Sequence, residues 1–132
     1  MRLKIVHAVG RIFVDVPVEI DMPEDPALAD FIQVLTAAAD AARAVNPEGQ
    51  FAGLEIVDGD PRDWIVDGRA ANGKPWRREV RAMCEGEAAF QALVAVLEDS
   101  RAVRVSDVAR LVEAMRRLTV EAVLPEDSTP AP

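Results

Sequence analysis

The chain has 132 residues, of which 50% are hydrophobic and 29% are charged, and its formal net charge is -8. A chain of this length can bury enough apolar surface for one hydrophobic core, and therefore for one domain. The negative net charge argues against nucleic acid as the main partner, because the field of the whole molecule repels phosphate.

The N-terminal residues and the cysteine content predict the compartment. The single cysteine, Cys84, excludes a framework of intramolecular disulfides, which is typical of small secreted proteins. Charged side chains such as Lys4, Arg11 and Asp15 interrupt the apolar N-terminus, so we expect neither a signal peptide nor a membrane span there. The prediction is a cytoplasmic protein without a membrane partner.

The first twenty residues have the pattern of a β-hairpin. β-branched and aliphatic residues alternate with other types over residues 12–20, which predicts a strand. A second apolar segment precedes it, and Gly10-Arg11 provides a turn, so we expect an antiparallel hairpin over residues 2–21. Pro17 lacks an N–H group, which places it on an edge strand or at a bulge.

A helix is predicted after this hairpin. Asp25 is a favourable capping residue, and Pro26 suits the first helical position. Apolar residues then recur at spacings of three and four as far as Val45, which indicates an amphipathic helix. In the middle of the chain we expect short strands over residues 54–57, 64–66 and 76–83, with Asn-Gly at positions 72 and 73 as a tight turn.

The last third of the chain is predicted to be helical. One apolar stripe begins near Glu85, and a second helix follows an extended link at residues 103–105, with Ser106 as its cap. Three prolines in residues 124–132 indicate a disordered tail. We find no internal sequence repeat.

The order β-β-α-β-β-β-α-α predicts an α+β fold in a single domain over residues 1–123. We expect one antiparallel sheet of about four to five strands, packed against about three helices.

The usual catalytic and metal-binding motifs are missing. His7 is the only histidine and Cys84 the only cysteine, so a zinc cluster or a Cys-His pair has little support. The acidic segment 58–63 resembles a calcium loop only in part and is predicted to be a turn. Phosphate-binding glycine loops and the GxSxG nucleophile motif are absent. We therefore expect no enzyme activity, no cofactor and no metal.

Charge is unevenly distributed along the chain. Residues 1–60 contain 4 basic and 11 acidic side chains, whereas residues 61–90 contain 6 basic and 5 acidic ones. The basic segment also holds both tryptophans, and arginine with tryptophan is typical of the energetic centre of an interface. We predict a partner-binding hairpin formed by Trp64, Arg69, Lys74, Trp76, Arg77, Arg78 and Arg81.

A simpler interpretation of this hairpin remains open. Period two puts Trp76, Arg78 and Val80 on one face of the strand and Arg77 and its alternate neighbours on the other. The arginines would then only balance the acidic remainder of the molecule.

The function predicted is that of a non-catalytic protein–protein interaction module, an adaptor or an inhibitor. An inhibitor that mimics nucleic acid is one version, suggested by the acidic residues Asp15, Glu19, Asp21, Glu24, Asp25 and Asp30. An alternative is a small ligand-binding protein or enzyme that uses Arg77 or Arg78 on an anionic ligand. Another is a structural homo-oligomer, with a homodimer interface on the last helix formed by Val108, Leu111, Val112, Met115 and Leu118.

Overall fold

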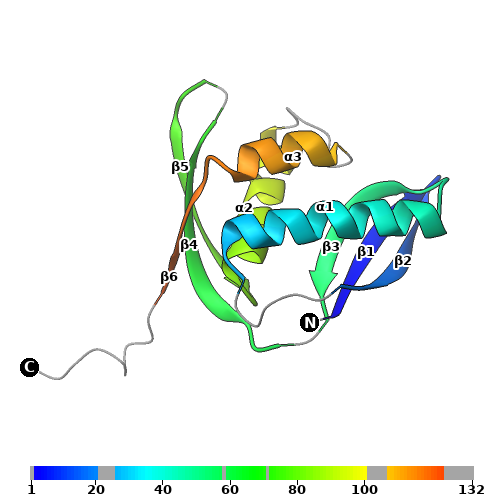
Figure 1. The fold of residues 1–132 in the computed structure, drawn as a ribbon. Coiled ribbons are helices and arrows are strands. Elements are labelled where there is room, and N and C mark those ends of the chain that lie inside the picture. Colours follow the sequence, from blue (N-terminus) through cyan, green and yellow to red (C-terminus); the bar gives the residue numbers. More distant parts are fainter. Residues whose placement is uncertain (1, 21–25, 58, 71, 101–106, 124–132) are drawn as a thin grey trace, which may run out of the picture.

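In a computed structural model of the chain, the described residues form nine elements of secondary structure (Figure 1). The structure describes residues 2–20, 26–57, 59–70, 72–100 and 107–123. In chain order the elements are β1 (Arg2–Val9), β2 (Ile12–Glu19), α1 (Leu28–Val45), β3 (Gln50–Ile56), β4 (Arg62–Arg69), β5 (Pro75–Ala82), α2 (Glu85–Ser100), α3 (Val108–Met115) and β6 (Thr119–Ala122).

The strands form two sheets with the same topology. The first sheet has the order β2-β1-β3 and the second β5-β4-β6, and every pairing is antiparallel. In each half a hairpin is followed by helix, and the next strand pairs with the first strand of the hairpin. The α+β class and the three helices are confirmed, but the prediction of one sheet with four to five strands is wrong.

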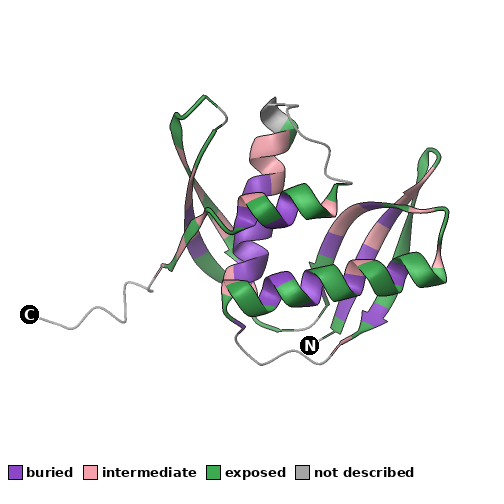
Figure 2. Cartoon of the chain, turned by 45° about the horizontal axis from the view of Figure 1, so that its top comes forward, coloured by how far each residue is buried: buried purple, intermediate pink, exposed green. Residues whose placement is uncertain are grey.

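The three helices lie between the two sheets (Figure 1). Helix α1 contacts the first sheet, α2 contacts the second, and the two helices contact each other. Buried residues lie on the faces that meet in this middle layer, and the outward surfaces of the strands are largely exposed (Figure 2). The helices thus form one layer that contacts both sheets.

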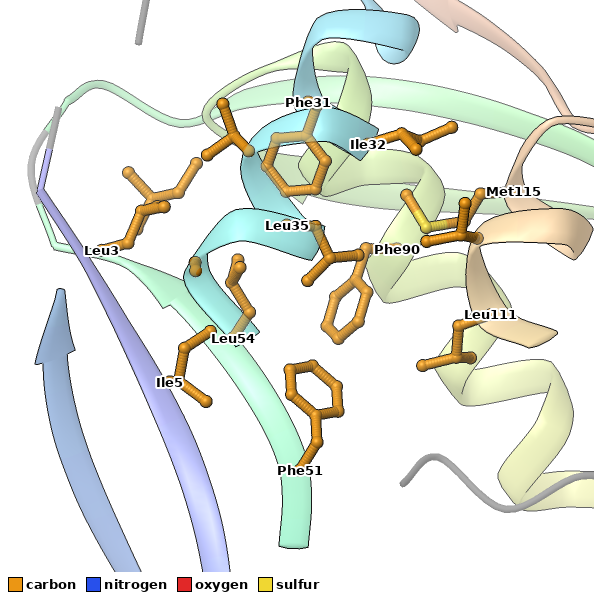
Figure 3. Close-up of a cluster of buried hydrophobic side chains, with 14 of the residues drawn as sticks. Leu3, Ile5, Phe31, Ile32, Leu35, Phe51, Leu54, Phe90, Leu111 and Met115 are labelled. Atoms are coloured by element: carbon orange, nitrogen blue, oxygen red, sulfur yellow. The ribbon is translucent and has the colours of Figure 1, made fainter. Parts of the chain in front are cut away.

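The main core joins all three helices to the first sheet (Figure 3). Phe51 of β3 and Phe90 of α2 meet edge to face, with ring centroids 6.1 Å apart and an interplanar angle of 83°. Leu111 of α3 is fully buried in the same core. A smaller cluster lies between α2 and the second sheet, where the small alanine side chains let the helix approach closely. It consists of Trp64, Val66, Ala82, Ala88 and Ala92.

The predicted N-terminal hairpin is confirmed. β1 and β2 pair in register from Arg2 with Glu19 to Val9 with Ile12. Pro17 lies on β2, the edge strand of the first sheet, as its missing N–H group requires. The bulge in this sheet is elsewhere, on β3 where it faces β1, because the register passes from Val6–Gly53 to His7–Phe51 and leaves Ala52 as the extra residue.

α2 begins at Glu85 as predicted, but the starts of α1 and α3 differ from those predicted. α1 begins at Leu28, and its N-cap Ala27 makes no side-chain hydrogen bond; Asp25 lies outside the described residues. α3 is capped by Asp107, whose carboxylate accepts a hydrogen bond from the N–H of Arg110. Ser106, residues 103–105 and the predicted tail at residues 124–132 also lie outside the described part.

Three further observations complete the fold. Strand β6 was missed in the sequence, because its alternation of polar and apolar residues spans only four positions directly after the apolar stripe of the last helix. Asn72-Gly73 forms the predicted turn between β4 and β5, with a positive φ of 84° at Gly73. In the described part of the chain, no helix is both long and apolar enough to cross a membrane.

Candidate binding groove

A groove separates the β4–β5 hairpin from α3. β6 pairs with β4 only over residues 64–67, whereas β5 pairs with β4 as far as Arg69. The far half of the hairpin therefore faces the end of α3 instead of a third strand, and a space of about 620 Å³ lies between them. This groove is open to solvent on one side.

The apolar floor of the groove depends on a glycine. Trp76 lies opposite Gly68 in the β4–β5 ladder. A Cβ at Gly68 would overlap both the Trp76 ring and the Leu118 side chain, so the absence of a side chain lets the ring lie across β4 towards α3. Leu93 of α2 completes this apolar surface.

Two arginines and one carboxylate bring charge to the groove. Arg69 lines it from the end of β4, and Arg117 lines it from the turn after α3. Asp67 also lines it, but its carboxylate is engaged by Arg77, with Nε 2.7 Å from Oδ1. This ion pair raises the pKa of the Arg77 guanidinium, mainly through its hydrogen bond with Asp67. The charge open to a ligand is therefore positive.

The hairpin tip holds Arg69 in place. Its Nη1 donates a hydrogen bond to the carbonyl of Gly73, at 3.1 Å. The N–H of Ala70 donates to the carbonyl of Lys74, and the N–H of Lys74 donates to the Asn72 side chain, at 2.9 and 3.0 Å. These bonds tie the end of β4 to the residues just before β5, so Arg69 approaches the groove from a hydrogen-bonded segment.

The two tryptophans have different roles. Trp64 is buried between the second sheet and α2, and its indole Nε1 donates a hydrogen bond to the carbonyl of Ala82, at 3.0 Å. The Arg62 guanidinium lies 4.7 Å from the centroid of its ring, a cation–π contact. Trp64 is therefore part of the fold, whereas the half-buried Trp76 lines the groove.

The structure divides the predicted hairpin residues among three places. Arg69 and Trp76 line the groove, and Lys74 lies at the exposed tip. Arg77 and Arg81 lie on the outer face of the second sheet, opposite Asp67 and Asp63 in the ladder. Arg78 lies opposite the buried Val66, on the inner face, as the period-two pattern predicted.

Sequence reasoning missed the groove residues that follow α3. Arg117 and Leu118 lie about forty positions after Trp76 in the chain, and only the tertiary fold brings them to the groove. The one available signal was that Leu118 continues the apolar stripe of the last helix. The stripe itself is buried in the main core at Leu111 and Met115, so it offers no homodimer surface there.

The isolated histidine and cysteine are both interior residues. His7 is buried on the helix-facing side of β1, and its Nδ1 lies 3.4 Å from Nδ2 of Asn46. A Cβ at Gly49 would overlap the His7 ring, which shows how closely the chain after α1 packs on it. Cys84 is fully buried at the start of α2. Among the described residues, no group of three or more His, Cys, Asp and Glu side chains could hold a metal ion.

The predicted acidic face is only partly within the described residues. Asp15 and Glu19 are exposed on β2, and Asp30 is exposed in the first turn of α1. Lys4 contacts Asp15 and Glu55, at 3.3 and 3.1 Å, and these two carboxylates, Glu55 first, raise the pKa of its ammonium group. Asp21, Glu24 and Asp25 lie outside the described part.

Comparisons with known proteins identify no relative: no family model, no curated protein and no solved structure matches the chain.

Proposed function

We propose that the protein is a non-catalytic binding module and that its groove receives an acidic, partly apolar segment of a partner protein. The observation that carries the proposal is the combination of an apolar floor with two arginines in a chain of net charge -8. Tryptophan and arginine supply a large share of the binding energy of many protein interfaces. A negatively charged segment would pair with Arg69 and Arg117 while its apolar side chains cover Trp76.

The side chains of the groove support binding more than catalysis. Its ionisable side chains, among the described residues, are Asp67, Arg69 and Arg117, and Asp67 is paired with Arg77. This set can neutralise an anion, but it includes neither a histidine nor a cysteine to act as a base or nucleophile. A cytoplasmic location remains part of the same proposal.

A small anionic ligand is the second candidate. The groove volume of about 620 Å³ falls in the range of small-molecule sites. Such sites usually enclose most of the ligand surface, and this groove is open on one side. The openness is the reason for ranking a partner segment first.

The groove is tested first with an amphipathic anion of known structure. We expect 8-anilinonaphthalene-1-sulfonate to bind the wild-type protein and to accept energy from Trp76. The double variant Arg69→Glu/Arg117→Glu should bind the probe at least about tenfold more weakly, because both cations become anions. The matched control is Arg43→Glu/Arg116→Glu, which makes the same change of net charge on exposed residues that do not line the groove. Equal loss in both double variants would contradict a specific site.

Capture of the partner from the native host then separates the two candidates. A photo-crosslinker at Lys74, on the rim of the hairpin, should trap one protein in the wild type and in the control variant but not in the groove variant. A crosslinker at Glu79 on the outer face of the sheet should not trap it. If the dye binds as expected and no protein is trapped, the small-ligand candidate replaces the partner segment.

A further inference from the structure

The outer edge of β2 carries an unusual run of exposed apolar residues. Ile12, Phe13 and Val14 are 62%, 73% and 36% exposed. β2 is the edge of the first sheet, with β1 on one side and no strand of the described chain on the other. Natural edge strands are normally protected by charges or proline, and an exposed apolar edge is a site for pairing with another strand.

The free edge offers its backbone at alternate residues. In a strand, the N–H and C=O groups of successive residues point to opposite sides. Pro17 pairs with Lys4 in the β1–β2 ladder although it has no N–H group to donate to β1. The backbone groups of Pro17 therefore point away from β1, towards the open edge. Phe13 and Asp15 share this parity, and their backbone groups therefore point to the open side. This leaves donors and acceptors ready on the apolar part of the strand.

The charges beside this segment are arranged symmetrically. Arg11 precedes the three exposed apolar residues and Asp15 follows them, each two positions from Phe13. When two copies pair antiparallel about Phe13, Ile12 of each copy faces Val14 of the other, and Arg11, in the turn just before β2, comes beside Asp15 of the other copy. We propose that the edge of β2 binds a second copy of this chain in this register, forming one continuous six-stranded sheet.

Other symmetric registers match less well. Pairing about Asp15 would bring two carboxylates face to face, which is destabilising. Pairing about Val14 would set Phe13 opposite Asp15 and Arg11 opposite Pro17, with no ion pair. Pairing about Phe13 keeps Pro17 beyond the paired segment, so its missing N–H interrupts nothing. Phe13 is therefore the centre that satisfies charge, apolar contact and backbone together.

This interface is independent of the groove. The β1–β2 hairpin and the β4–β5 hairpin belong to different sheets and lie on opposite sides of the molecule (Figure 1). Val45, the last residue of α1, is 74% exposed. It lies near the end of the first sheet that carries the β1–β2 turn, because the adjacent Asn46 contacts His7 of β1. An interface of one strand pair is small, so the dimer should form and dissociate with concentration.

Sedimentation velocity tests the pairing. Between about 5 and about 500 µM, the wild-type mass should rise from 14.3 kDa towards twice that value. Arg11→Asp and Asp15→Arg should each weaken association about tenfold, since each reverses two symmetric ion pairs. The double exchange Arg11→Asp/Asp15→Arg should restore it, because the opposite charges again face each other. Asp40→Arg, on the exposed side of α1, is the matched control.

A crosslink tests the register itself. Directly opposed residues of a hydrogen-bonded antiparallel pair have Cα atoms about 5.5 Å apart, within disulfide range. Phe13→Cys should therefore form a covalent dimer under mild oxidation, and Glu19→Cys should not. Thermal unfolding of each variant checks that the fold is intact. A wild type that stays monomeric at every concentration, or a charge exchange without rescue, would overturn the proposal.

Discussion

Phe31→Ala is expected to lower the free energy of unfolding by about 3–5 kcal/mol, the largest effect of any single substitution considered for this protein. Phe31 is fully buried on α1 and belongs to the core that all three helices share with the first sheet. Its ring lies against the start of α2, where a Cβ at Gly86 would overlap it. The substitution therefore leaves a cavity at the junction of both halves of the molecule.

Gly86→Ala should also destabilise, by about 1–3 kcal/mol, although alanine is the better helix former. A Cβ at Gly86 would overlap Cβ and Cγ of Phe31. In the Phe31→Ala background the overlap with Cγ disappears while the overlap with Cβ remains, so the cost of the Gly86 substitution should fall. Urea denaturation of the wild type, both single variants and the double variant gives this coupling. Gly53→Ala, which makes only ordinary van der Waals contact with Val6, is the control; additive effects of the Phe31 and Gly86 substitutions would refute the packing argument.

The sequence predicted the local elements better than their arrangement. Alternation over residues 12–20 and the Asn-Gly turn indicate hairpins, because side-chain period and turn conformation are local properties. Both hairpins exist, but no local property says which strands share a sheet. Residues 54–57 and 64–66 were expected in one sheet, whereas β3 pairs with β1 and β4 begins a second sheet.

Alternation also failed to predict burial along β2. Ile12 and Val14 share their face with the buried Val16 and Val18, so the pattern alone places all of them in the core. The structure buries Val16 and Val18 in the second half of the strand and leaves the first half exposed. The first half is next to the hairpin turn, beyond the part of the sheet that α1 covers. Where a helix ends over a sheet depends on tertiary packing, which the period of two does not report.

The candidate groove was predictable only in part. Arg69 and Trp76 were identified from composition, and the two faces of β5 were assigned correctly from period two. Arg117 and Leu118 could not be placed beside them, since their position depends on how α3 packs between the sheets. Trp64 had the same sequence signal as Trp76, yet its burial under α2 makes it structural.

Glu87 joins the two halves of the molecule. It is buried in the first turn of α2, where its Oε1 accepts a hydrogen bond from the N–H of Met83 at 2.7 Å. Its Oε2 faces the N–H of Ile56 at the end of β3, at 3.4 Å. One carboxylate thus satisfies a donor before α2 and another on the first sheet, so both halves depend on it.

Removing this carboxylate should cost about 2–4 kcal/mol, because Glu87→Ala leaves buried N–H groups without acceptors. Glu87→Gln should cost less, since its amide oxygen still accepts one hydrogen bond. Glu85→Ala in the same turn, where the side chain is only partly buried, should cost less than about 1 kcal/mol. Urea denaturation at neutral pH measures all three, and equal costs for Glu87→Ala and Glu85→Ala would contradict the role of Glu87.

The pH dependence of stability gives Glu87 a signature that packing alone would not produce. Burial raises the pKa of its carboxyl group above the ordinary value of 4.5, although the N–H groups of Met83 and Ile56 oppose the rise. Between these two pKa values the folded chain holds a proton that the unfolded chain has released, so the contribution of Glu87 to stability falls as the pH rises. The glutamine in Glu87→Gln does not titrate. Subtracting the unfolding free energy of this variant from that of the wild type therefore cancels the pH dependence that all other carboxyl groups contribute. Measured from about pH 4 to about pH 8, this difference should decrease with increasing pH, and a constant or increasing difference would contradict the raised pKa.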